Sequence, residues 1–166
     1  PDARLQVEQE AVVPHFDVLQ AYAVPTVDDY REVPGLEVKP PNVWLYFVRA
    51  RSDVLDRFAS ENGLEDLEAR QVEDEFVWRN SFWLNQCYYA SLGDKRAFVL
   101  CHGRDLIVLK IVGYAEQVAE YYQLEDQLAR VWISHQRYPT KGRVWHPGGA
   151  HPFVGLNEAL VHNGDF

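Results

Sequence analysis

The run VWLYFVRA at residues 43–50 constrains the fold more than any other segment of the chain. It consists almost wholly of β-branched, aromatic and aliphatic residues, which are typical of a buried strand. Ser52 follows in a position suited to a helix N-cap, and apolar residues recur at helical spacing through residues 53–62. Gly63 stands where a glycine commonly ends a helix. The sequence therefore predicts a buried strand followed directly by a helix.

Other periodic segments predict a mixture of helices and strands. A second helical region is expected within residues 64–84, because its first residues are acidic, and a short helix over 115–123. The segments that favour strands are 18–24, 87–91, 96–102, 105–112, 130–135 and 158–162. The pair 87–91 and 96–102 flanks Gly93-Asp94, which predicts a β-hairpin, whereas the proline- and glycine-rich segments 28–41 and 138–152 predict loops. The predicted class is α+β, with antiparallel strands predominating.

The composition limits the classes of function. The chain has 166 residues, 47% of them hydrophobic, which suits a single domain over residues 1–166. A net charge of -9 repels phosphates, so neither nucleic acid nor an anionic membrane is expected as a partner. The polar first residues do not resemble a signal peptide, and the sequence has no apolar run of membrane-spanning length. We therefore expect a cytoplasmic protein.

Arg137 and Thr140 form the first group of candidate binding residues. Arg137 follows a predicted strand and begins a loop rich in proline and glycine, HQRYPTKG over residues 135–142. A guanidinium there could hold a carboxylate through two parallel hydrogen bonds, and the Thr140 hydroxyl could reach the same anion. Taken alone, a surface arginine followed by a threonine turn is the simpler interpretation.

The sequence His162-Asn163-Gly164 forms the second group. An asparagine amide and a glycine backbone N–H can converge on one point and so form an oxyanion hole. Asn-Gly is also the commonest dipeptide of tight turns, and on spacing alone the turn is the simpler interpretation.

In combination, these residues resemble the class II glutamine amidotransferases, whose nucleophile is an N-terminal cysteine. Three motifs occur in that family's order: Arg137-Tyr138-Pro139-Thr140-Lys141-Gly142, then Ala150-His151-Pro152, then His162-Asn163-Gly164. The segments Tyr88-Tyr89-Ala90-Ser91-Leu92, Val108-Leu109-Lys110 and Tyr121-Tyr122 resemble the glutamate synthase-like subgroup, and the resemblance extends from about residue 43 onward. Asp165-Phe166 departs from the Glu-Ile that follows this motif in classical glutamate synthases.

The resemblance implies a function and a fold. Arg137 and Thr140 would bind the α-carboxylate of L-glutamine, His151 would shape the pocket, and Asn163 and Gly164 would form the oxyanion hole. The activity would be hydrolysis of glutamine to glutamate and ammonia through a cysteine thioester, with the ammonia passed to a synthase domain or subunit. The implied fold is a four-layer α/β/β/α sandwich of the N-terminal-nucleophile hydrolase type. The domain itself would need no cofactor, although FMN or an iron–sulfur cluster is plausible in the partner.

The nucleophile of that family is missing from these residues. Residue 1 is proline, and the two cysteines, Cys87 and Cys101, fall within predicted strands where a thiol is expected to be buried and inert. The sequence also has no methionine. We therefore expect a fragment of a longer domain, incomplete at both ends and inactive alone.

The sequence leaves two alternatives to a glutamine-hydrolysing amidotransferase. An amidotransferase-like module that has lost its nucleophile could bind or regulate a partner. A metal-dependent hydrolase ranks far behind, because the histidines His135, His146, His151 and His162 lack the spacing of a zinc motif. These histidines are expected to shape the glutamine pocket, and no metal site is predicted.

Overall fold

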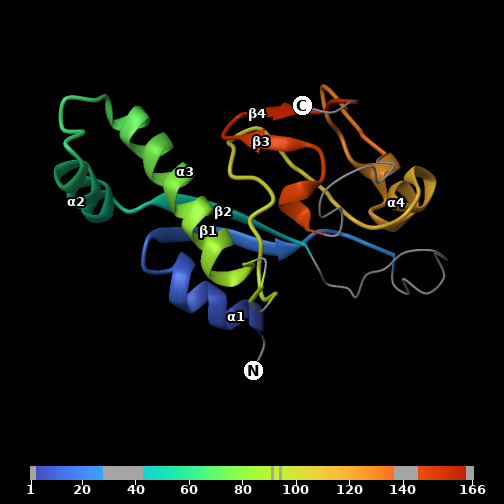
Figure 1. Ribbon diagram of the computed structural model, residues 1–166, viewed down its shortest axis with the longest axis horizontal. Coiled ribbons are helices and arrows are strands. Elements are labelled where there is room, and N and C mark those ends of the chain that lie inside the picture. The colour runs from blue at the N-terminus through green and yellow to red at the C-terminus, as the bar shows by residue number, and fades with distance from the viewer. Residues whose placement is uncertain (1–2, 28–42, 91, 94, 137–145, 164–166) are drawn as a thin grey trace.

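The N-terminal elements form a short helical segment and an antiparallel pair of strands. The computed structural model describes residues 3–27, 43–90, 92–93, 95–136 and 146–163 (Figure 1). Helix α1 (Ala3–Val7) continues into the π-helical turn η1 (Glu8–Val12). Strand β1 (Phe16–Ala23) pairs with β2 (Trp44–Ala50), with an irregularity between Val18 and Gln20. The strands predicted at 18–24 and 43–50 are thus confirmed.

Helix α2 (Ser52–Asn62) follows β2 directly, as the sequence predicts. Its N-cap is Arg51 rather than Ser52, because Arg51 is the last residue with extended angles (φ -71°, ψ 134°), so the prediction was wrong by one residue. Gly63 ends the helix with φ 65°, a left-handed conformation that glycine adopts without strain.

Helix α3 (Ala69–Tyr88) is the longest element and extends beyond the helical region predicted within 64–84. Its buried hydrophobic residues are four or eight positions apart, namely Val72, Phe76, Leu84 and Tyr88. This period continues through Tyr88, so the strand predicted at 87–91 and its hairpin with 96–102 are wrong. Cys87, expected to be buried in a strand, is exposed on this helix.

The segment from 95 to 136 is held by packing rather than by a sheet. Helix α4 (Ala115–Tyr121) and the 3₁₀ turn η3 (Leu124–Asp126) confirm the helix predicted at 115–123. The strands predicted at 96–102, 105–112 and 130–135 are wrong, since the described residues there pair with no strand. Leu109 and Ile111 instead pack against Tyr121 and Tyr122, whose side chains are fully buried. This packing removes the side chains of Leu109 and Ile111 from water, and it does not require the backbone to pair with a strand.

A small hairpin lies near the C-terminal end of the described residues. After the 3₁₀ turn η4 (Pro147–Gly149), strand β3 (Phe153–Gly155) pairs antiparallel with β4 (Glu158–Leu160). The strand predicted at 158–162 is confirmed over residues 158–160, whereas β3 lies outside every predicted element. The α+β class is confirmed, since the described strands form two separate two-stranded antiparallel sheets among helices.

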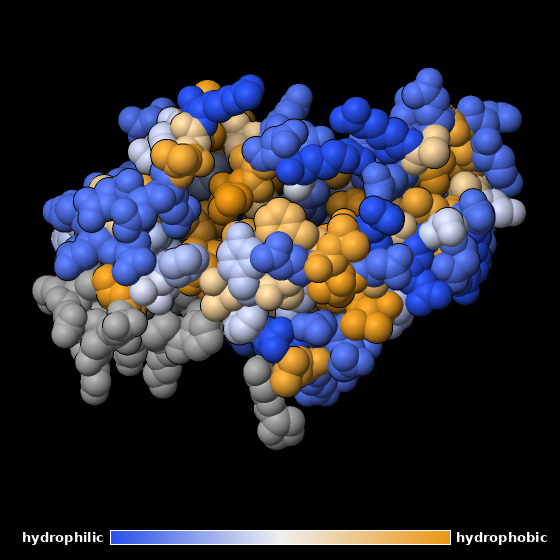
Figure 2. All heavy atoms as spheres, turned by 180° about the vertical axis from the view of Figure 1, so that it is seen from behind, coloured by the Kyte–Doolittle hydropathy of each residue, from blue (hydrophilic) through white to orange (hydrophobic). Residues whose placement is uncertain are grey.

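The helices α1 and α3 pack on one side of the β1–β2 sheet. The guanidinium of Arg4 lies 4.1 Å from the Trp44 ring, and Phe16 packs against Phe76 of α3. The opposite side carries the stacked rings of Tyr22 and Phe47, which are 37% and 49% exposed. Figure 2 shows hydrophobic side chains gathered across the middle of the face opposite to that of Figure 1. Among the described helices, none combines the length and apolar character needed to cross a membrane.

Candidate functional site

The β3–β4 hairpin brings two of the three motifs to the same end of one ladder. Phe153, the first residue of β3, directly follows the Ala150-His151-Pro152 motif and pairs with Leu160, the last residue of β4. His162 and Asn163 come two and three residues after Leu160. Because the strands are antiparallel, the chain enters and leaves the hairpin side by side, so the two motifs are neighbours in space.

His151 connects this end of the hairpin to His135, which precedes the arginine motif in the sequence. Its half-buried ring lies 4.4 Å from the His135 ring and 4.4 Å from the Phe153 ring, measured between centroids. His135 is two residues before Arg137. The described chain before the arginine loop therefore reaches His151, beside the end of the hairpin that carries the Ala150-His151-Pro152 motif.

The predicted site residues are described only in part. His151 is half-buried and Asn163 is exposed. Arg137, Thr140 and Gly164 lie outside the described residues.

The turn of the hairpin is fixed by residues 102–104. Leu156 has φ 50°, which costs a non-glycine residue roughly 1 kcal/mol and persists only where the surroundings hold it. Its N–H donates to Nε2 of His102 at 3.1 Å, and the N–H of Arg104 donates to Oδ1 of Asn157 at 2.8 Å. A Cβ at Gly103 would overlap the Leu156 carbonyl oxygen, so only glycine allows this approach.

His102 is held in its neutral form. Its Nε2 accepts a hydrogen bond, which requires that the proton reside on Nδ1. Burial lowers the pKa of His102, in agreement with this assignment.

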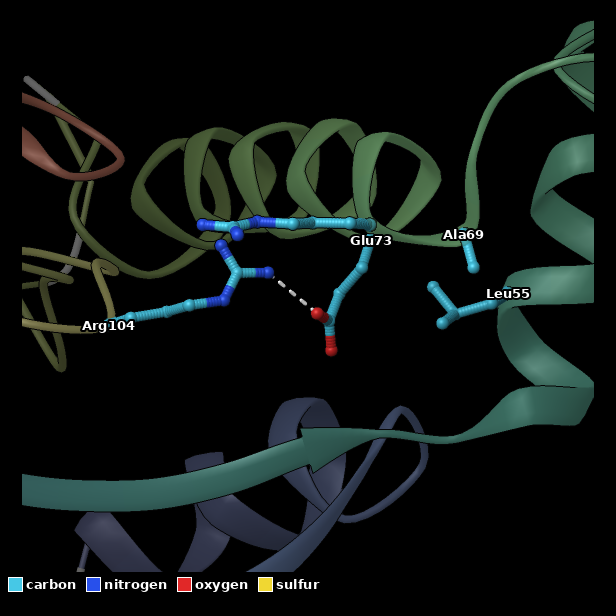
Figure 3. Close-up of a pocket in the computed structure, with 5 residues that line it drawn as sticks. Leu55, Ala69, Glu73 and Arg104 are labelled. Atoms are coloured by element: carbon cyan, nitrogen blue, oxygen red, sulfur yellow. Dashed lines mark hydrogen bonds and ion pairs between the residues drawn. The ribbon is translucent and has the colours of Figure 1, made fainter.

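The Arg104 side chain connects the hairpin support to helix α3. Its guanidinium lies 2.7 Å from Oε2 of Glu73 (Figure 3). It also pairs with Asp74. These carboxylates raise the pKa of Arg104 further. Arg104 and Glu73 line an open depression with Leu55, Ala69 and Arg70. This depression is a separate feature, because the residues that line it belong to none of the three motifs.

The turn that precedes the Ala150-His151-Pro152 motif is held by two side chains. His146 accepts from the Gly148 N–H at Nδ1 (3.0 Å), and its Nε2 lies 3.2 Å from the Tyr89 carbonyl oxygen. This arrangement is that of a neutral imidazole protonated at Nε2. Nζ of Lys110 donates to the carbonyl oxygens of Pro147 and Ala150, at 2.8 and 2.9 Å.

Lys110 and Cys101 are the perturbed titratable groups nearest to this turn. Burial lowers the pKa of Lys110 to about 8 and raises the pKa of the Cys101 thiol. The Cys101 thiol donates to the Leu106 carbonyl at 3.4 Å. The neighbouring His102 instead accepts a hydrogen bond from the Leu156 N–H of the hairpin. A protonated, half-buried thiol with this partner is not an activated nucleophile.

The contacts of Lys110, His102 and Gly103 were not predicted from the sequence, and neither was the role of His146 as a helix cap. Lys110 was visible as a charge within an apolar run, which is a signal for a buried polar contact. Within the part of the chain that the structure describes, no three His, Cys, Asp or Glu side chains are grouped as a metal site requires.

Comparison with known proteins identifies one similar sequence. The chain is 32% identical, over 152 residues, to an uncharacterized protein of Archaeoglobus fulgidus. The alignment covers 91% of this chain and 34% of that protein, so the chain spans about a third of the length of this relative. No protein-family model and no solved structure matches the chain.

Proposed function

We propose that this chain is the glutamine-binding part of a class II glutamine amidotransferase domain, similar to the glutaminase domain of glutamate synthases. The convergence of the motifs supports it most directly. The β3–β4 hairpin makes residues 150–152 neighbours of His162 and Asn163, and the His151 ring touches His135 just before the arginine loop. A shared pocket requires the described parts of these motifs to lie near one another, and their positions on either side of the hairpin meet that requirement.

In the proposed site, each motif has a distinct task. Arg137 and Thr140 bind the α-carboxylate of L-glutamine, since a guanidinium forms a paired contact with a carboxylate. The Asn163 side chain and the Gly164 N–H stabilise the oxyanion that forms when a thiolate attacks the side-chain amide. Ammonia then leaves, and water hydrolyses the thioester to glutamate. His151 shapes the pocket between the arginine loop and the hairpin.

The attacking thiol is not supplied by either cysteine of the chain. Cys87 lies within helix α3, whereas the nucleophile of the class II family is an N-terminal cysteine, and burial raises the pKa of Cys101, which disfavours its thiolate. We propose that the thiol belongs to another part of the encoded protein. Residues 1–166 would then be one incomplete domain of the four-layer α/β/β/α type, and the ammonia would pass to a synthase domain or subunit. The exposed hydrophobic side of the β1–β2 sheet agrees with a second layer packing there.

The same cysteines favour one alternative, an amidotransferase-like module that binds glutamine or a partner without catalysis. The two functions differ in what the product of the complete reading frame does. A catalytic domain releases ammonia from L-glutamine, and Asn163→Ala lowers that rate by about 10²–10³-fold through loss of an oxyanion donor. A binding module retains glutamine affinity but releases no ammonia.

Glutamine binding by the 166-residue chain tests the proposal directly. In titration calorimetry we expect L-glutamine to bind, with L-asparagine and D-glutamine binding much more weakly. Arg137→Lys should weaken binding about tenfold or more, because an ammonium cannot form the paired contact. Arg130→Lys, at an exposed arginine seven residues earlier, is the matched control and should leave the affinity unchanged. Absence of L-glutamine binding, or equal affinities of the two variants, would contradict the proposal.

A further inference from the structure

Lys110 makes contacts that its position in an apolar run does not require. Its ammonium lies half-buried, and both of its hydrogen-bond acceptors belong to a segment 37 to 40 residues further along the chain. The acceptors are neutral carbonyls, of Pro147 and Ala150. A lysine is costly to bury, and burial already lowers the pKa of Lys110 to about 8. A contact that carries this cost is expected to serve a structural or functional purpose.

The two carbonyls bracket the η4 turn. The turn has its own backbone bonds, Gly149 N–H to the His146 carbonyl at 2.8 Å and Ala150 N–H to the Pro147 carbonyl at 3.4 Å. The second bond is long, so the turn is weakly closed at its C-terminal end. Lys110 joins the carbonyls on either side of that bond, since an ammonium can donate to two acceptors at once.

The N-terminal end of the turn is fixed separately. The His146 ring packs edge-on against Tyr89 and Phe98, with centroids 5.2 and 5.7 Å away, in addition to its contacts with Gly148 and the Tyr89 carbonyl. The turn is therefore anchored at His146 by the aromatic cluster and at Ala150 by Lys110. His151 is the next residue, so its position depends on the second anchor.

We propose that Lys110 is a positioning residue of the glutamine pocket, whose ammonium fixes the Pro147 and Ala150 carbonyls and thereby holds His151 beside His135. This inference rests on the proposed function for the identity of the ligand. The two hydrogen bonds from Lys110 to the Pro147 and Ala150 carbonyls, called the clasp below, are observed independently of that function. Lys110 touches the turn and acts on the pocket through it.

Three variants of the 166-residue chain test the inference. Lys110→Met keeps the length of the side chain and removes all donors, and Lys110→Arg restores a cation with donors in a different geometry. Lys95→Gln is the matched control, because Lys95 also donates to a backbone carbonyl, that of Ala90, but is exposed. Each variant is measured by amide hydrogen exchange of residues 146–152 and by calorimetric titration with L-glutamine.

We expect Lys110→Met to speed exchange at Ala150 and to raise the Kd for L-glutamine, each by about tenfold or more, since charge-assisted hydrogen bonds are lost. Lys110→Arg should fall between Lys110→Met and wild type, and Lys95→Gln should match wild type. Exchange in α3 should stay unchanged, which separates a local effect from unfolding. If Lys110→Met unfolds the chain, the α3 amides report it, and faster exchange at Ala150 in Lys110→Arg then supports the clasp.

The inference and the proposed function fail in different ways. Glutamine binding by wild type, with unchanged exchange or unchanged Kd in Lys110→Met, would overturn the role of Lys110 and leave the proposed function standing. Absence of glutamine binding by wild type would overturn the proposed function and the pocket role together. Exchange at Ala150 that is equal in all variants would overturn the clasp.

Discussion

Replacing Gly103 with alanine would disturb the support of the β3–β4 hairpin without altering any motif residue. A Cβ at this position overlaps the Leu156 carbonyl oxygen and comes within 3.2 Å of Oδ1 of Asn157. The obstacle is largely backbone, which cannot rotate away as a flexible side chain would. The hairpin turn must therefore move, or residues 102–104 must.

The magnitude follows from what that movement costs. Overpacking by one methyl group costs about 1–3 kcal/mol, and the hydrogen bonds at risk, to His102 and from Arg104, contribute roughly 0.5–1.5 kcal/mol each. Relief of the overlap breaks these bonds, so the two costs replace one another rather than add. Alanine also lowers the conformational entropy of the unfolded chain, which offsets the loss of stability by about 0.4–1 kcal/mol. We expect a net loss of about 1–2 kcal/mol in the free energy of unfolding of the hairpin region.

Amide exchange at Leu156 and urea unfolding followed by tryptophan fluorescence measure this loss locally and globally. Gly155→Ala is the matched control, because a Cβ at Gly155 meets nothing within 4 Å. The Gly103→Ala variant should show faster exchange at Leu156 and a weaker affinity for L-glutamine, while Gly155→Ala should be at least as stable as wild type, because alanine there restricts the unfolded chain without a clash. Equal exchange and equal unfolding midpoints in the two variants would refute the argument that Gly103 permits the close approach.

Two further predictions concern the protonation of His102 and the hydrophobic core around Phe76. Because burial lowers the pKa of His102, its support of Leu156 is fully present above the usual histidine pKa of about 6.5 and is lost as the pH falls through the lower folded value. The protection factor of the Leu156 amide, which corrects exchange for its intrinsic dependence on pH, should therefore fall on acidification in wild type and be nearly independent of pH in His102→Gln, and a pH dependence shared by both would contradict this. Phe76→Ala should lower the free energy of unfolding by about 3–5 kcal/mol because the ring lies in the core between Phe16 and Phe58. Leu128→Ala, at a fully exposed side chain, should change it by no more than about 0.5 kcal/mol. Chemical denaturation that shows equal effects of the two changes would indicate that the cluster of Phe16, Phe58 and Phe76 is not part of the core.

Sequence patterns correctly predicted the helices and strands that are determined by residues close together in the chain. The strand at 44–50 and the helix at 52–62 were predicted because β-branched residues, helical spacing and a terminal glycine act within a few residues of one another. The end of α3 was misjudged, since Tyr88 keeps the helical period but is followed by residues that favour strands. At 105–112 the apolar run correctly indicated burial of Val108, Leu109 and Ile111, although Ile107 and Val112 are exposed. Whether a buried segment joins a sheet depends on which strand lies beside it.

The three motifs could be found in the sequence alone, because an arginine loop or an Asn-Gly pair is defined by neighbouring residues, and the chemistry proposed for them follows from those residue types. The arrangement of the described residues around them was decided only by the tertiary structure. The pairing of Phe153 with Leu160 makes residues 150–152 neighbours of His162 and Asn163, and His135 contacts His151. The support by Lys110 and His102 joins residues 37 to 54 positions apart. Such contacts depend on the path of the whole chain, so no local pattern of residue types specifies them.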